Sequence, residues 1–325
     1  MSLAAQKKII ILFVLITAGV FFYGSISGCS YAKPEESVSV EEQMIPTASY
    51  VSSFTIPVTD APGLLTESND KAFIDYSNKQ DGYITVKFLE NTDRMLMVVI
   101  TTPDGDEYIY NLNPEANEVF PLTSGNGRYK ISIHEHVADN VFLDILLVEI
   151  DVELRDEFVP FIRPNQYVYY SENSPVTKKA VELSTKDNNF IDTVESIFNF
   201  VVDSVSYDFE LAQSVAFGYK PDLDEVLDQG SGICFDIAAL TVAMLRSQGI
   251  PSKLVFGNYY GSDLDYQYHA WVTVFSEEDV RIGEHIFFTA GTWNILDPTV
   301  AIILCLSETD ATTSDGVTYN AMYYY

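Results

Sequence analysis

The hydrophobic pattern changes its period about halfway along the chain, and this limits the possible folds more than any other feature. Over residues 71–161 apolar and polar side chains alternate, as Ile84, Val86 and Phe88 do, which is typical of half-buried strands. Over residues 190–205 apolar side chains instead recur at spacings of three and four, which indicates an amphipathic helix. With 325 residues, the chain is long enough for two domains of different class.

The first of these domains is predicted to be a β-sandwich covering residues 71–165. Turn sequences such as Pro103–Asp106 separate several short alternating segments, with no helical pattern between them. His134 and His136 lie two positions apart on one such segment. Two histidines with this spacing could begin a metal site, but no third ligand is near, so we interpret them as solvated strand residues and expect no metal.

The second domain, residues 166–325, is predicted to be α+β. Ser174 and Pro175 are typical of a helix start, and Gly249 is typical of a helix end. Helical patterns come first and are followed by strand-like runs, which favours this class. We expect strands at residues 253–259, 269–275, 284–289 and 300–306, and another beginning within 293–299. The tail after Leu306, which ends in three tyrosines, is expected to form a closing strand, with an aromatic contact surface as the alternative.

Cys234 follows a Gly-Ser-Gly turn and begins one of the predicted helices. Unpaired backbone N–H groups and the helix dipole favour an anion at that position, here a thiolate. A catalytic thiol also needs a base, and the base needs a third group to orient it. His269 and Asp297 lie downstream and supply both types of side chain. The alternatives are a packing cysteine, a structural sheet histidine and an Asp-Pro turn; zinc is disfavoured because short ligand pairs are missing.

Four segments resemble, in order, the motifs of the transglutaminase-like superfamily: residues 232–238, 245–251, 269–271 and 293–299. The resemblance implies a papain-like α+β core. It also implies that Cys234 is the nucleophile, His269 the general base and acid, and Asp297 the carboxylate that orients the imidazole. The Cys234 backbone N–H should belong to the oxyanion hole, with Tyr207 and Gln229 as candidates for a second donor. Because no calcium-binding loop pattern is present, we expect no cofactor.

The N-terminal segment has the layout of an export signal. Lys7 and Lys8 precede an apolar run, residues 9–22, that is short for a membrane span. Residues 26–29, Ile-Ser-Gly-Cys, resemble the lipobox of bacterial lipoproteins. This predicts a signal peptide over 1–28, a lipid on Cys29, a flexible tether over 29–70, and an extracytoplasmic protein anchored to the bacterial cell membrane. The alternative is an uncleaved anchor with an incidental cysteine.

The charge balance and the cysteine count exclude other classes. With 18 Lys and Arg against 47 Asp and Glu, a net charge of -29, the chain lacks the basic clusters that bind nucleic acid. Three cysteines are few for a disulfide-stabilised exported protein. Cys305, in a predicted apolar strand, is interpreted as a small buried hydrophobe. A disulfide between Cys234 and Cys305 is the alternative, and it would silence the site.

Together these features predict an extracytoplasmic enzyme that attacks amide bonds of proteins or peptides through a thioester at Cys234. Either water or a second amine could resolve the thioester, so protease, amidase and acyltransferase activities all remain open. The competing hypothesis is an inactive binding protein that uses the β-sandwich and a degenerate scaffold. No pattern in the sequence indicates the oligomeric state.

Overall fold

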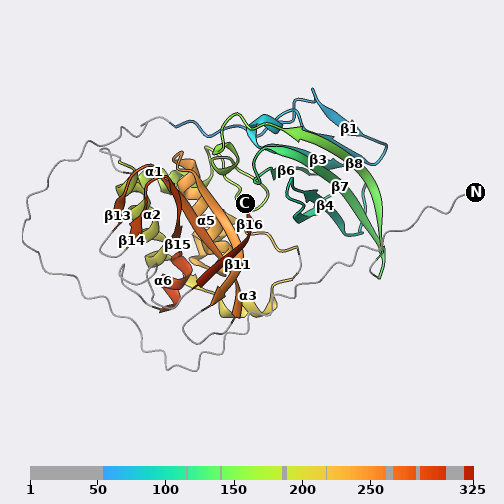
Figure 1. Ribbon diagram of the computed structural model, residues 1–325. Helices are drawn as coiled ribbons and strands as arrows, with labels where there is room; N and C mark the ends of the chain where they lie inside the picture. Colours follow the sequence, from blue (N-terminus) through green and yellow to red (C-terminus); the bar gives the residue numbers. More distant parts are fainter. Residues whose placement is uncertain are drawn as a thin grey trace, which may run out of the picture.

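The computed structural model of the chain describes residues 54–114, 116–139, 141–184, 189–216, 218–260, 266–282, 286–304 and 318–325. The predicted lipidation at Cys29 and the predictions on Cys305 and residues 1–53 lie outside these residues. In Figure 1 the strands of the first half of the chain lie on one side of the molecule and the helices of the second half on the other. No helix in the described ranges is long and apolar enough to cross a membrane.

The first half of the chain forms two four-stranded antiparallel sheets around an apolar core, which confirms the all-β prediction. The first sheet has the order β1 (Thr66–Ser68), β2 (Ala72–Asp75), β3 (Tyr83–Phe88), β6 (Asn117–Pro121). The second has the order β5 (Glu107–Leu112), β4 (Leu96–Thr101), β7 (Gly127–Ala138), β8 (Val141–Val152). Two short 3₁₀ helices, Lys79–Asp81 and Val159–Phe161, lie between and after these strands.

Strand β1 lies within the stretch predicted to be a tether. Its three residues, Thr-Glu-Ser, are all polar or charged, so no alternation marks them as a strand. The strand nevertheless pairs with β2, and Asp75 of β2 accepts a hydrogen bond from the Gly63 backbone N–H at 2.6 Å. Backbone pairing with a neighbouring strand has therefore ordered a segment that local sequence left undetermined.

The prediction that His134 is a solvated strand residue is wrong, because only 5% of the residue is exposed. A bulge between Ile133 and His134 shifts the register between β7 and β8, and the chain is buried continuously from Ile131 to Glu135. His134 Nε2 lies 2.8 Å from Ser132 Oγ. Its neighbour His136 is half-buried and donates from Nε2 to the Asp139 carbonyl at 2.7 Å.

The second half of the chain has the predicted α+β class. Six helices are described: α1 (Pro175–Leu183), α2 (Phe190–Ser204), α3 (Phe209–Ser214), α4 (Leu223–Gln229), α5 (Cys234–Ser247) and α6 (Pro298–Leu304). The main sheet is antiparallel, with the order β15 (Thr292–Leu296), β12 (Tyr266–Ser276), β11 (Ser252–Tyr260), β16 (Thr318–Tyr324). Two smaller pairs are β9 (Ser206–Tyr207) with β10 (Ser231–Gly232), and β13 (Val280–Ile282) with β14 (Ile286–Phe288).

Helix α5 is the centre of this second half. It is buried from Asp236 to Ser247 and packs against β11, β12 and four other helices. Ala238, Ala239 and Ala243 are completely buried, and small side chains let a helix approach its neighbours closely. Gly249, just beyond the helix, has a φ of +78°, as its predicted role as a left-handed stop requires.

The predicted strand at residues 300–306 is wrong, since helix α6 occupies Pro298–Leu304. A short apolar run is compatible with either a strand or a buried helix. Here Asp297 decides between them, because its Oδ1 accepts the Val300 backbone N–H at 3.1 Å, as an N-cap does. The predicted closing strand at the end of the chain is confirmed as β16, which pairs with β11.

Candidate active site

Cys234 is the first residue of α5, and the turn before it is built by close backbone contacts. Residues Ser231 and Gly232 pair in parallel with β9. A Cβ on Gly232 would lie 2.6 Å from the Asp236 Cβ, so no larger residue fits there without a shift. Asp236 Oδ2 accepts the Ile233 backbone N–H at 2.8 Å and so fixes the entry into the helix. Cys234 is half-buried and its thiol is free.

His269 and Asp297 are brought together by neighbouring strands of the main sheet. His269 lies on β12, and Asp297 directly follows β15, which pairs with β12. The His269 Nε2 lies 2.8 Å from Asp297 Oδ2 and donates a hydrogen bond to it. The Asp297 carboxylate is completely buried. With Nε2 engaged, Nδ1 is the ring nitrogen left for the hydrogen bond that the imidazole makes with Cys234.

The surroundings of His269 favour its charged form. Burial by itself lowers the pKa of the imidazole, but the charge and hydrogen bond of Asp297, together with those of Cys234, raise this pKa to about 10. The ring therefore holds a proton at neutral pH. A protonated imidazole beside a cysteine favours the thiolate, which is the reactive form. Cys234 and His269 can thus form an ion pair, and the buried carboxylate of Asp297 keeps the imidazole in place.

Tyr319, on β16, is part of this cluster, and we did not predict it. Its hydroxyl donates to Asp297 Oδ2 at 2.9 Å, the same oxygen that accepts from His269. Burial, and then the Asp297 charge, raise the pKa of Tyr319, so its hydroxyl keeps the proton that it donates. The tyrosine-rich end of the chain was visible in the sequence, but nothing local indicated which of its side chains meets Asp297.

The two candidates for a second oxyanion donor are placed differently. Gln229 is exposed, and its amide donates to Glu225 Oε1 at 2.7 Å within its own helix. Tyr207 is half-buried beside the nucleophile. Burial raises the pKa of its hydroxyl, and the charges of Cys234 and Asp236 raise it further. The hydroxyl also accepts a hydrogen bond from the Cys234 backbone N–H, which lowers this pKa. The structure therefore places Tyr207, and not Gln229, at the Cys234 amide.

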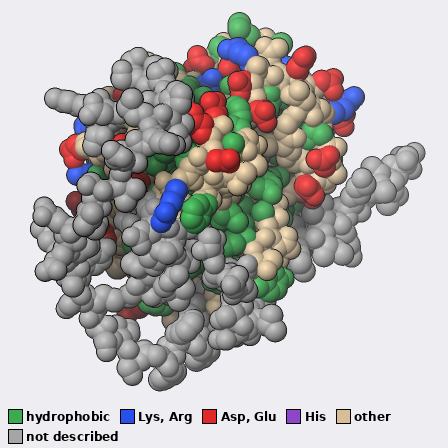
Figure 2. All heavy atoms as spheres, turned by 60° about the vertical axis from the view of Figure 1, so that its left-hand side comes forward, with side chains coloured by type: hydrophobic (Ala, Val, Ile, Leu, Met, Phe, Trp, Pro, Cys, Tyr) green, Lys and Arg blue, Asp and Glu red, His purple; other side chains and the backbone are tan. Residues whose placement is uncertain are grey.

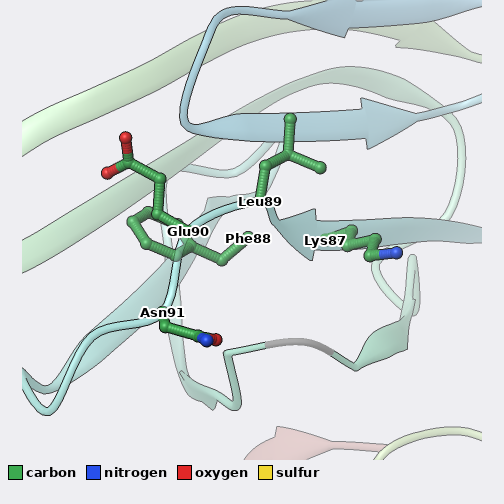
Figure 3. A pocket seen from close by; sticks show the side chains of 5 residues that line it. All are labelled: Lys87, Phe88, Leu89, Glu90 and Asn91. Carbon is green, nitrogen blue, oxygen red and sulfur yellow. The ribbon is translucent and has the colours of Figure 1, made fainter.

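Other surface features lie away from these side chains. The hollow shown in Figure 3 is lined by Lys87, Phe88, Leu89, Glu90 and Asn91 at the end of β3, in the β-sandwich. On the face shown in Figure 2, acidic side chains are scattered among hydrophobic ones and do not gather in one patch. Within the described part of the chain, no three His, Cys, Asp or Glu side chains are grouped as a metal site would need.

The residues of this cluster lie in a segment that matches a known protein family. Residues 177–298, which include Cys234, His269 and Asp297, match the model of the Transglutaminase-like superfamily. No curated protein matches the chain. A solved structure of a candidate cysteine protease from Cytophaga hutchinsonii matches 75% of this chain and 91% of its own, with 16% identity and a TM-score of 0.36.

Two further solved structures were compared with the chain. A transglutaminase from red sea bream matches 67% of this chain and 48% of its own, with 16% identity and a TM-score of 0.29. A candidate protease from Parabacteroides distasonis matches 62% of this chain and 61% of its own, with 14% identity and a TM-score of 0.26.

Proposed function

Since the chain carries a transglutaminase-like core with the papain-like fold over residues 177–298, we propose that it is a thiol enzyme that attacks amide bonds of proteins or peptides. The resemblance predicted from the sequence is confirmed by this match. The main support for activity is the contact of 2.8 Å between His269 Nε2 and the completely buried carboxylate of Asp297. A degenerate scaffold has no need to keep a buried charged pair beside a free thiol, because such pairs are costly to bury.

In the proposed first half-reaction, the Cys234 thiolate attacks the carbonyl carbon of the amide. The Tyr207 hydroxyl, which accepts the Cys234 backbone N–H, donates its own hydrogen to the carbonyl oxygen on which the negative charge develops. The carbon–nitrogen bond then breaks, and the His269 imidazolium gives its proton to the leaving amine. The products are a free amine and a thioester on Cys234, with His269 left neutral.

In the second half-reaction, neutral His269 takes a proton from the incoming nucleophile, which attacks the thioester carbon and releases the Cys234 thiolate. If water attacks, the enzyme is a protease or amidase. If a primary amine attacks, it is an acyltransferase. Asp297 acts only by orienting the imidazole and stabilising its charged form, since its carboxylate accepts from Nε2 throughout.

The location of the enzyme is a separate proposal that is supported by the sequence. We propose export through the signal at residues 1–28 and anchoring by a lipid on Cys29. Metabolic labelling of the full chain with a radioactive fatty acid tests this proposal, because Cys29→Ala should abolish the label.

Thiol labelling tests whether Cys234 is activated. The full chain should react with iodoacetamide rapidly at pH 6, because the charged imidazole favours the thiolate there. His269→Ala should lose this rate, and Cys234→Ala gives the background from any other thiol. Equal, slow labelling of the wild type and His269→Ala would reject the enzyme in favour of an inactive binding protein.

A second assay identifies the acceptor. The full chain is incubated with casein and a fluorescent primary amine. Incorporation of the amine identifies an acyltransferase, and casein fragments identify a protease. Cys234→Ala is the control in both cases, because it prevents formation of the thioester and leaves the His269 and Asp297 side chains unsubstituted.

A further inference from the structure

Asp236 is completely buried in the first turn of α5, and the proposed chemistry does not use it. Each of its carboxylate oxygens has a separate partner. Oδ2 accepts the Ile233 backbone N–H at 2.8 Å, and Oδ1 accepts the Tyr219 hydroxyl at 2.8 Å. Ile233 immediately precedes Cys234, so this carboxylate holds the backbone at the point where the nucleophile begins.

The Tyr219 side chain comes from a segment that is held by the β-sandwich. Its neighbour Lys220 forms an ion pair with Glu118 of β6, and both side chains are largely buried. On the other side of Tyr219, Gly218 lies so close to Asn111 of β5 that an added Cβ would be 2.6 Å from the Asn111 amide nitrogen. Gly218 also has a φ of +82°, which other residues rarely adopt.

Gln166, from the segment that joins the two halves of the chain, strengthens the sandwich side of this contact. Its amide nitrogen donates to the Asn111 carbonyl at 2.6 Å and to Glu118 Oε2 at 2.8 Å. Glu118 is therefore held by Gln166 while it binds Lys220 through its other oxygen. Two polar contacts, joined by the peptide bond between Tyr219 and Lys220, thus lead from the sandwich to the start of α5.

We propose that this series, Glu118–Lys220–Tyr219–Asp236, is an interdomain latch through which the β-sandwich positions Cys234 for attack. The inference rests on the proposed thiol chemistry for its functional consequence. Tyr219 acts in it as a positioning residue, because its hydroxyl touches Asp236 and not the reacting atoms. The sandwich is then a structural part of the enzyme in addition to any binding role.

The electrostatics at Asp236 explain why the Tyr219 hydroxyl matters. Burial raises the pKa of Asp236, and Asp208 adds to this, whereas the hydrogen bonds from the Ile233 N–H and Tyr219 oppose the rise. Tyr207 also lies within range of the Asp236 charge. When the Tyr219 donor is removed, the carboxylate should take up a proton at higher pH. As the pH falls, the protonated carboxylate would then hold the Ile233 backbone N–H less strongly, and this weakening would appear first at acidic pH.

The test measures iodoacetamide labelling of Cys234 in full-chain variants between pH 5 and pH 8. Tyr219→Phe should lower the rate about tenfold at pH 5 and less at pH 8, because it removes one hydrogen bond to a charged group. Lys220→Glu and Glu118→Lys should each lower the rate several-fold. The double variant restores the ion pair with reversed charges but leaves Gln166 without its acceptor, so it should recover part of the rate lost in the single variants.

Arg128→Glu is the matched control, since it breaks the ion pair of Arg128 with Glu149 (2.7 Å) on the surface of the same sandwich. It should leave labelling unchanged. Thermal unfolding of each variant shows whether it is folded. Where a single charge variant does not fold, the double variant is measured in its place. Wild-type rates at every pH in both Tyr219→Phe and Lys220→Glu would overturn the latch.

Amide hydrogen exchange separates a failed latch from a failed enzyme. In Tyr219→Phe and Lys220→Glu, the amides of residues 233–236 should exchange faster than in the wild type, while Arg128→Glu leaves them unchanged. This result does not depend on catalysis. If the wild-type thiol proves unreactive, the proposed function fails but the exchange still decides the latch; unchanged exchange in both variants rejects it.

Discussion

Two histidines, one in each half of the molecule, share a similar set of neighbours and have opposite properties. In the sandwich, His134 lies between the Ser132 hydroxyl at 2.8 Å and the Asp144 carboxylate at 3.0 Å. In the second half, His269 lies between Cys234 and the Asp297 carboxylate at 2.8 Å. Each set contains a side chain that can act as a nucleophile, an imidazole and a carboxylate.

The burial of the carboxylate distinguishes the two sets. The Asp144 side chain is 80% exposed, so water screens it, and burial of the imidazole prevails and lowers the pKa of His134. The Asp297 side chain is completely buried, and its unscreened charge raises the pKa of His269 instead. Ser132, moreover, is buried in a strand, whereas Cys234 begins a helix. Three residues of the right types are therefore not enough to make a catalytic triad. The carboxylate must also be buried and the nucleophile accessible.

Asp297→Asn should have the largest effect of the substitutions that test this comparison. Without the carboxylate, the pKa of His269 falls from about 10, and the ring loses its orientation. We expect the labelling rate of Cys234 at pH 6 and any amide turnover to fall by about a thousandfold or more. The ratio of the labelling rates of the wild type and the variant at pH 6 checks this prediction.

Asp144→Asn is the matched control for this prediction, because it also removes a carboxylate from a histidine. It should leave the labelling profile of Cys234 unchanged. Similar losses in both variants would show that a general change in fold or charge, and not the buried pair, is responsible.

Tyr319→Phe should have an intermediate effect. It removes one of two side-chain hydrogen bonds to Asp297 Oδ2 and leaves the ring, which packs against Trp271 at 5.1 Å. Loss of a hydrogen bond to a charged group predicts a roughly tenfold to hundredfold lower turnover number, with little change in KM. Tyr323→Phe, on the same strand with its ring against Tyr108, is the control and should behave as the wild type. A change in KM alone would place Tyr319 in substrate binding.

His134→Gln should have the smallest effect, and only on stability. Because the pKa of His134 is lower in the folded chain than its usual 6.5, the unfolded chain takes up the proton first as the pH falls. The contribution of this group to stability is thus present above pH 6.5 and is lost below it. Between pH 8 and pH 5 the variant should lose less in Tm than the wild type, by at most about 4 °C. Loss of Cys234 labelling in this variant would contradict the comparison.

The local sequence determined much of the architecture. Alternation specified strands such as β5, in which every second residue is buried, and spacings of three and four specified α2, because each period presents one apolar face to a core. The Gly-Ser-Gly turn and the stop at Gly249 specified α5, since their backbone requirements are local. The types and order of Cys234, His269 and Asp297 likewise indicated the chemistry, because a thiol nucleophile needs a base and the base needs an orienting carboxylate.

Other features were decided only by tertiary structure, because they depend on residues far apart in the sequence. The register shift at His134 arises between two strands, and α6 replaces a predicted strand where Asp297 caps a run compatible with both. Tyr319 reaches Asp297 only because β16 pairs with β11, and Tyr219 reaches Asp236 from a segment held by the sandwich. A hydrophobic period reports which face of an element is buried, but it carries no information about which distant polar group that face will meet.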